Sequence, residues 1–280
     1  MLRFYSLVFI VLFSNMLYSQ NSEFGIGVGQ SKYYGDLSSS GDFKNTIHPA
    51  FQLYYNYYFN KYLITRISLA HGKISGDDKY STQQWQQERN LSFESSIIEG
   101  SIVAQLHVLG SDKFISPFFY GGFNVFHFNP KTLYKGEWVY LQPLGTEGQG
   151  SELHPEKIKY SLYDVSMVMG AGIKIRINSR FSLSFELGWR KCSTDYIDDI
   201  STNYVNYAEI KRTNGTLAAE LSDRTPEYLG IENPLTRETG AIRGNPDNKD
   251  YYVMSFTNFV YKFNSDKTIK LSKKVKCPRF

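Results

Sequence analysis

The feature that most constrains this chain is a two-residue alternation of side-chain character along eight segments of ten or more residues. In residues 181–190, large apolar side chains occupy the odd positions, and Ser, Glu, Gly or Arg occupies each even position. Successive side chains of a β-strand point to opposite faces, so this alternation predicts strands with one apolar face. The predicted strands lie near residues 23–34, 47–59, 62–73, 92–108, 115–128, 165–176, 181–190 and 251–263.

The connections between these segments fall into two classes that alternate along the chain. Three are short turns, and the other four are long loops. Outer-membrane β-barrels have short periplasmic turns and longer extracellular loops, and an even strand number returns the chain to its starting side. We therefore expect both termini in the periplasm. The short turns are residues 60–61, 110–113 and 178–180, and the long loops are about 35–46, 74–91, 129–162 and 193–250.

The hydropathy of the chain must be weighed against its aromatic content. A mean hydropathy of -0.37 is typical of soluble proteins, but 22 Tyr, 20 Phe and 3 Trp cluster near the ends of the alternating segments. Barrel strands hide their hydrophobicity by alternation and gather aromatic residues at the two membrane interfaces. We predict an all-β fold, an eight-stranded antiparallel transmembrane β-barrel. A soluble β-sandwich is the alternative, but it does not need strands so long and so aromatic.

The N-terminal residues indicate the compartment. Arg3 precedes an apolar run from Phe4 to Phe13, and a small, polar exit follows at Ser19 and Gln20. This is the layout of a secretory signal peptide, and the run is shorter than the roughly 20 residues of a spanning helix. The expected organisation is a signal peptide at 1–20, an outer-membrane barrel at 21–263 and a basic periplasmic tail at 264–280.

The inward faces of the predicted strands carry charged residues. The interior of an eight-stranded barrel is just wide enough to be filled by side chains. Buried charges persist only when they are paired and hydrogen-bonded, so we expect the two glutamates to meet the basic residues in a structural plug. The predicted lumen network comprises Arg66, Glu99, Lys174, Arg176, Glu186 and Arg190.

No residue pattern points to catalysis, to a metal or to a cofactor. His71 and His127 are the candidates for a hydrolase triad, but nothing in the sequence pairs them with a nucleophile. The acidic run Asp195, Asp198 and Asp199 lacks the spacing of a calcium loop, and we interpret it as the solvated start of the fourth loop. The net charge of +4 does not by itself suggest nucleic acid, and we expect no small-molecule substrate.

The last 17 residues form a basic tail that contains six Lys or Arg and one Asp. A basic segment with an apolar tip suits docking on an acidic protein surface or on lipid head groups. The predicted partner-binding residues are Lys270, Lys273, Lys274, Lys276, Cys277, Pro278, Arg279 and Phe280.

The two cysteines are expected on opposite sides of the membrane, Cys192 at the extracellular rim and Cys277 in the periplasm. A disulfide requires a Cα separation of no more than about 7 Å, so we predict no bond between them. An unpaired Cys in an oxidising compartment suggests a partner on another chain. Cys277 is therefore our candidate for an intermolecular disulfide.

Several segments in this order resemble the PorG family, the outer-membrane β-barrel component of the type IX secretion system of Bacteroidetes. The resemblance extends across the whole mature chain. The segments are Tyr34–Leu37, Pro143–Gly150, Thr194–Ser201, Arg243–Pro246 with Asp250 and Tyr251, and Cys277–Phe280.

This resemblance implies a structural role that no residue pattern shows. Such proteins are thought to tie a periplasmic ring, built from a lipoprotein and its partner, to the outer membrane, in a machinery for protein export and gliding motility. The tail ending at Cys277 is then the expected contact with the ring lipoprotein, and the other expected partners are further secretion components and outer-membrane lipids. The alternative function is that of a surface protein that acts through its long loops as an adhesin or a lipid-modifying enzyme.

Overall fold

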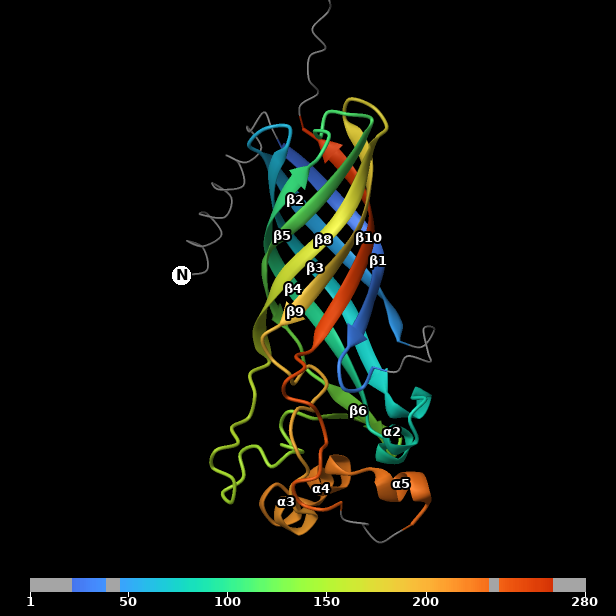
Figure 1. Cartoon of the computed structure of the whole chain (residues 1–280), viewed down its shortest axis with the longest axis vertical. Helices are drawn as coiled ribbons and strands as arrows, with labels where there is room; N and C mark the ends of the chain where they lie inside the picture. Colours follow the sequence, from blue (N-terminus) through green and yellow to red (C-terminus); the bar gives the residue numbers. More distant parts are fainter. Residues whose placement is uncertain (1–21, 39–45, 232–236, 264–280) are drawn as a thin grey trace, which may run out of the picture.

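The computed structural model describes residues 22–38, 46–231 and 237–263, and its central feature is a closed antiparallel β-barrel (Figure 1). Each barrel strand pairs with its neighbours along the chain, and β10 pairs with β1 to close the sheet. The predicted eight-stranded fold is confirmed. The barrel strands are β1 (Ser22–Tyr34), β2 (Ile47–Tyr58), β3 (Leu63–Asp77), β4 (Ser92–His107), β5 (Ile115–His127), β8 (Tyr163–Arg176), β9 (Phe181–Cys192) and β10 (Tyr251–Lys262).

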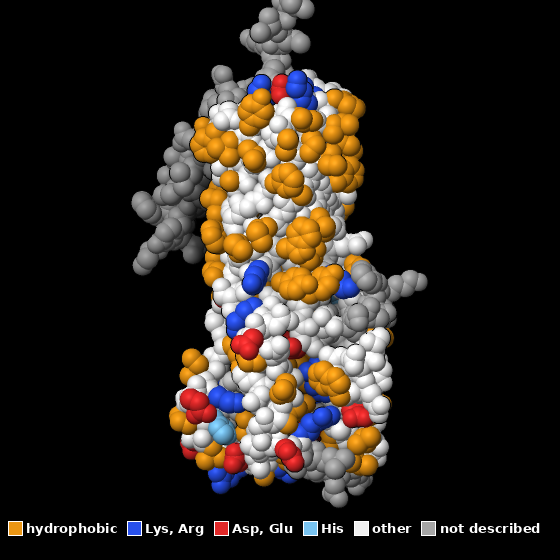
Figure 2. Space-filling model, in the orientation of Figure 1, with side chains coloured by type: hydrophobic (Ala, Val, Ile, Leu, Met, Phe, Trp, Pro, Cys, Tyr) orange, Lys and Arg blue, Asp and Glu red, His pale blue; other side chains and the backbone are white. Residues whose placement is uncertain are grey.

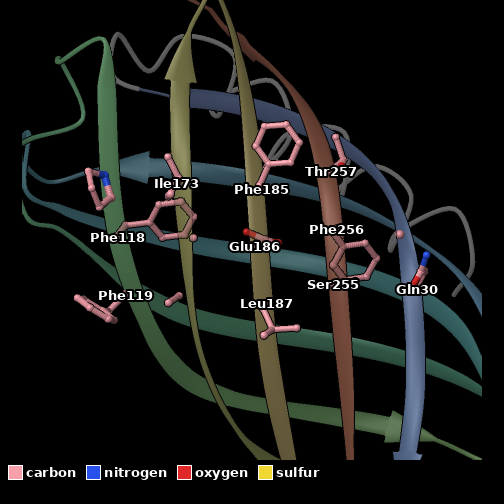
Figure 3. A pocket seen from close by; sticks show the side chains of 14 residues that line it. Gln30, Phe118, Phe119, Ile173, Phe185, Glu186, Leu187, Ser255, Phe256 and Thr257 are labelled. Carbon is pink, nitrogen blue, oxygen red and sulfur yellow. The ribbon is translucent and has the colours of Figure 1, made fainter. Parts of the chain in front are cut away.

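The outer wall of the barrel is apolar, as the alternation predicts. On β9, Phe185 and Leu187 point outward and are exposed, whereas Glu186 between them is buried inside (Figure 3). Apolar side chains cover the barrel wall in Figure 2. Lipid tolerates a sheet only when its edges are closed and its outer face is apolar, so this is a membrane-spanning barrel of the outer-membrane type.

Inside the barrel, aromatic rings pack directly on glycines. The ring of Tyr54 lies against Gly25, and the ring of Tyr120 lies against Gly170 and Gly188, where a Cβ atom would overlap it. A glycine in a strand often marks such a close approach. The glycines that alternate along β1 and β8 therefore face inward because the narrow lumen needs their space for large side chains.

The two ends of the barrel differ. Three short turns lie at one end, here the turn end, and both described chain ends meet there, since the Phe263 N–H donates to the Ser22 carbonyl at 3.2 Å. The long connections lie at the opposite end, here the loop end. β3 runs to Asp77, beyond the predicted 73, because residues 73–77 pair with Ser92–Ser96 of β4 in a hairpin that extends past its neighbours.

The long connections contain short elements that the alternation did not reveal. No helix in the described ranges is long and apolar enough to cross a membrane. The hairpin of β6 and β7 joins β4 through a single residue pair, Glu94 with Lys131. The elements are β6 (Lys131–Tyr134), β7 (Glu137–Tyr140), the 3-10 helix η1 (Asp78–Tyr80), α2 (Gln84–Arg89), α3 (Tyr207–Thr213), α4 (Thr216–Ser222) and α5 (Thr225–Leu229).

Together these connections form one folded unit, here the cap, which comprises residues 35–38, 78–91, 128–162, 193–231 and 237–250 (Figure 1). Its apolar residues share a core with the inward residues of the barrel mouth, so the cap is packed into the barrel rather than tethered to it. The cap contributes Leu37, Leu91, Phe128, Leu141, Ile197, Ile200 and Leu221, and the barrel contributes Ile74, Phe126, Tyr252 and Met254.

The membrane-facing wall can be tested with two leucines that are equally exposed. Leu187 on the barrel wall and Leu153 in the cap are each 41% exposed. We expect Leu187→Arg to destabilise the folded barrel in lipid by about 2–4 kcal/mol, the cost of Arg near the bilayer midplane. Leu153→Arg should change stability by less than about 0.5 kcal/mol, as is usual for a surface site in water. Urea unfolding in phospholipid vesicles measures both. Equal losses would contradict a lipid-facing wall.

Candidate functional site

Ion pairs cross the lumen at three levels. Arg190 on β9 meets Glu99 on β4 at 2.9 Å, and Arg66 on β3 meets Glu186 on β9 at 2.7 Å. Both pairs are buried and carry further hydrogen bonds. Tyr252 donates to Glu99 at 2.7 Å. Together with Lys174, whose partner is described next, five of the six predicted lumen charges are thus paired across the barrel. These pairs fill the cross-section of the lumen and do not line an open path.

The third pair involves a residue that the sequence analysis missed. Lys174 on β8 meets Glu23 on β1 at 2.5 Å, and both side chains are buried. Glu23 lies on the same face as Gly25, because alternate residues of a strand share a face. The alternation along β1 was therefore sufficient to predict that Glu23 faces the lumen.

Arg176, the sixth predicted lumen residue, does not join the network. It faces the turn end beside Arg180 and Lys262, and it forms no ion pair with a carboxylate in the described part of the chain. The predicted pairing of Arg176 is therefore absent among residues 22–38, 46–231 and 237–263.

The two histidines weighed as triad members lie on the outer wall. His71 and His127 flank Ile98 in register, one on each side. His71 Nε2 is 2.9 Å from the Ser96 hydroxyl, and His127 packs on Tyr163 with ring centroids 4.8 Å apart. Neither forms a hydrogen bond to a carboxylate within the described ranges. This leaves a His–Ser contact without an acid.

An extensive polar arrangement is buried in the cap. The guanidinium of Arg89 makes two hydrogen bonds to Asp78, at 2.7 and 2.8 Å. It also donates to the backbone carbonyls of Asp36 and Arg243, at 3.0 and 2.5 Å. One buried side chain thereby joins the first, second and fourth long connections.

A second guanidinium joins the third connection to the fourth. Arg243 donates to Glu147 at 2.8 Å and to the carbonyl oxygens of Asp199 and Ser222. Glu147 is fully buried, and it also accepts from the Ser201 N–H and the Thr202 hydroxyl. We call Arg89, Asp78, Arg243 and Glu147 the hub, because together they connect all four long loops.

The hub gathers the segments that carry the family resemblance. Asp36, Glu147, Asp199 and Arg243 come from four separate motifs, and each belongs to the hub or accepts a hydrogen bond from it. The tail motif lies outside the described residues. The motifs therefore serve mainly to build the cap, and a structure was needed to show this because no two of them are neighbours in sequence.

The acidic run at the start of the fourth loop corrects our prediction. We expected Asp195, Asp198 and Asp199 to be solvated, but each is no more than 2% exposed. The Tyr33 hydroxyl reaches Asp198 at 2.6 Å and Asp250 at 2.9 Å, bringing two carboxylates together. The expectation failed because the loops fold back over the barrel mouth, which a local charge pattern does not reveal.

Burial raises the pKa of these carboxyl groups. Burial, followed by repulsion from Asp250, raises the pKa of Asp198 well above its usual value. Burial, followed by repulsion from Asp195, does the same for Asp250. Burial also raises the pKa of Asp195 to about 6. Folding of the cap therefore shifts all three carboxyl groups toward their protonated forms.

The remaining sequence predictions concern metals, cysteines and the tail. The described ranges contain no group of three or more His, Cys, Asp or Glu side chains arranged to hold a metal ion. Cys192 is buried at the loop end of β9 and is not disulfide-bonded within these ranges. Two sets of predictions lie outside the described residues. They are the signal peptide, and the tail residues Lys270, Lys273, Lys274, Lys276, Cys277, Pro278, Arg279 and Phe280.

Comparison with known proteins gives one family and several structures. The model of a family described as a domain of unknown function (DUF6089) matches residues 2–219. No curated protein matches the chain.

The solved structures that are similar to this chain include outer-membrane barrels of low sequence identity. Ail, the attachment invasion locus protein of Yersinia pestis, is 10% identical, with 86% of this chain and 97% of Ail covered and a TM-score of 0.41. Neisserial surface protein A is 7% identical, with 86% and 96% covered and a TM-score of 0.42. The outer-membrane enzyme PagL is 12% identical, with 85% and 97% covered and a TM-score of 0.29.

The hub predicts that the cap can be loosened without unfolding the barrel. Arg243→Leu leaves Glu147 buried without its ion-pair partner, which typically costs about 3–5 kcal/mol. We expect limited proteolysis of the cap to become much faster, while the barrel keeps its heat-modifiable migration on gels. Arg212→Leu, an exposed change at the end of α3, is the matched control. Equal cleavage rates in the two variants would refute the hub's role.

The raised carboxyl pKa values predict a pH dependence of the cap. Because the folded-state pKa values exceed the unfolded ones, protonation stabilises the cap, and this stability is lost as pH rises through about 6 for Asp195. We expect backbone amides of residues 195–200 to exchange more slowly at pH 5 than at pH 8, after correction for intrinsic rates. Asp195→Asn should reduce the difference, whereas the exposed Asp247→Asn should not. An unchanged profile in Asp195→Asn would count against this origin.

Proposed function

The chain belongs to the DUF6089 family, and from that premise we propose that it is a structural outer-membrane component of the type IX protein secretion machinery. In this role it anchors a periplasmic ring, built from a lipoprotein and its partner, to the outer membrane. The resemblance to the PorG family is the source of the specific machinery, and the structure supplies the physical reasons for an anchor.

The observation that carries the proposal is that the path through the barrel is obstructed at two places, within the lumen and at the loop end. Buried ion pairs cross the lumen at Glu99, Glu186 and Glu23, and the cap packs into the loop end. A conduit for solutes requires a continuous polar path through the barrel. An anchor requires only a rigid barrel with one surface that a partner can bind. Cross-lumen pairs and a packed cap favour rigidity.

The turn end is the face that we assign to the periplasm. The described barrel ends there at Phe263, so the basic tail 264–280 begins there. Its six basic residues suit an acidic surface on the ring lipoprotein. Within it, Cys277 is proposed to form an intermolecular disulfide with that partner, which would make the anchorage covalent.

A second candidate function rests on the outer face of the cap. Ile158 and Ile242 are 80% and 74% exposed, which is high for large aliphatic side chains on a surface in contact with water. In this second candidate function, the cap presents these side chains to a partner and acts as an adhesin, independently of the tail.

Truncation separates the two functions. A chain that ends at Phe263 keeps the barrel and the cap but loses the tail. If the chain is an anchor, we expect at least a tenfold loss of type IX cargo in the culture medium, with the truncated barrel still heat-modifiable in outer membranes. Cys277→Ala should in addition remove a slower-migrating band on non-reducing gels. A normal secretome in the truncated strain would refute the anchor, and Ile158→Asp with Ile242→Asp would then test adhesion.

A further inference from the structure

A pocket of about 380 Å³ opens at the turn end of the barrel. We call it the cup. Its floor is formed by the buried pair of Lys174 and Glu23, and its walls come from the three short turns and the end of β10. The charged residues around the floor are Lys61, Asp112, Arg176, Arg180 and Lys262.

The charge of the cup is unbalanced. Glu23 is already engaged by Lys174, with both carboxylate oxygens within 2.7 Å of Nζ. This leaves Asp112, which is exposed in its turn, beside Lys61, Arg176 and Arg180. These three basic side chains form no ion pair within the described ranges. In Figure 2, Lys and Arg side chains accordingly gather at this end of the barrel.

The turns add hydrogen-bond donors to this positive charge. In the first turn, Asn60 Oδ1 accepts from the N–H groups of Tyr62 and Leu63, at 2.8 and 2.9 Å. In the third turn, Asn178 Oδ1 accepts from those of Arg180 and Phe181 at the same distances. The only acceptor atom of each side-chain amide is therefore engaged by backbone N–H groups of its own turn. The two NH₂ groups have no acceptor in the described part of the chain, and both residues line the cup.

We propose that the cup is a docking site for a short acidic peptide segment of a periplasmic protein. The proposal rests on the function proposed above, because it places the turn end in the periplasm, and it extends that function from the tail to the barrel itself. Guanidinium groups and amide donors together match carboxylate oxygens, which accept several hydrogen bonds at once. A volume of about 380 Å³ is near the small end of ligand pockets, so a few side chains fit but a folded domain does not.

The chain's own tail is a poor occupant of the cup. It begins beside the cup, but it carries six basic residues and one Asp, so like charges oppose its entry. The tail and the cup are thus both basic, and the tail follows directly on the end of β10 that lines the cup. A partner with acidic residues can then engage both, and the two contacts reinforce each other because the second becomes intramolecular.

The test measures binding of a fluorescein-labelled tetrapeptide of alternating Glu and Asp to the full-length barrel in detergent micelles, by anisotropy at low ionic strength. The same peptide made of Gln and Asn is the neutral control. We expect the double variant Arg176→Gln with Arg180→Gln to bind the acidic peptide at least about tenfold more weakly, since it removes two guanidinium groups that make charge-assisted hydrogen bonds to the peptide carboxylates. Lys113→Gln removes a charge from the second turn, outside the cup lining, and should change affinity less than about twofold.

Three results would overturn the proposal. They are equal binding of the neutral peptide, equal weakening by Lys113→Gln, and at least tenfold tighter binding by the chain that ends at Phe263, which would make the tail the occupant. The two proposals also fail separately. If the double variant retains peptide binding while truncation still abolishes secretion, the anchor function is supported and the proposal for the cup is refuted. If peptide binding depends on the cup but truncation leaves secretion normal, the proposal for the cup is supported and the anchor function is refuted.

Discussion

The rest of the structure depends on closure of the sheet between β1 and β10. In lipid, no water is present to satisfy the polar edge of a strand, and each unsatisfied backbone group would cost several kcal/mol. The register from Glu23 opposite Lys262 to Tyr34 opposite Tyr251 removes both edges at once. Closure with eight strands also fixes a narrow lumen, and that width explains the inward glycines under Tyr54 and Tyr120 and the cross-lumen ion pairs.

The cap and the lumen differ in whether their buried carboxyl groups have cationic partners. In the lumen, each buried glutamate has a cationic partner on another strand, so the charges rigidify the barrel without leaving an unpaired group. In the cap, Glu147 is treated in the same way by Arg243, but Asp195, Asp198 and Asp250 have no ion pair in the described ranges. Burial without a cation favours their protonated forms. The cap therefore combines a hub that is charged with a neighbouring cluster that responds to pH.

The two ends of the molecule are chemically opposite. Buried acidic groups concentrate at the loop end, whereas basic groups gather around Arg176 and Arg180 at the turn end. Between them lies a lumen filled at three levels. A barrel of this design offers two separate faces and connects them rigidly, which suits a protein that holds something in place. The basic face and the tail beyond it are the parts that the proposed function uses.

The sequence by itself determined the strands and their order, because the alternation of apolar and polar residues is a local property that lipid enforces on every strand. It also determined which charges face inward, and the parity that places Glu186 and Arg66 in the lumen extends to Glu23. Only the tertiary structure decided how the four long loops meet. Arg89, Glu147 and Arg243 come from three different loops, so their contacts depend on long-range packing that leaves no periodic signal. For the same reason, Asp195, Asp198 and Asp199 read as a solvated run in sequence but are buried once the loops close over the barrel mouth.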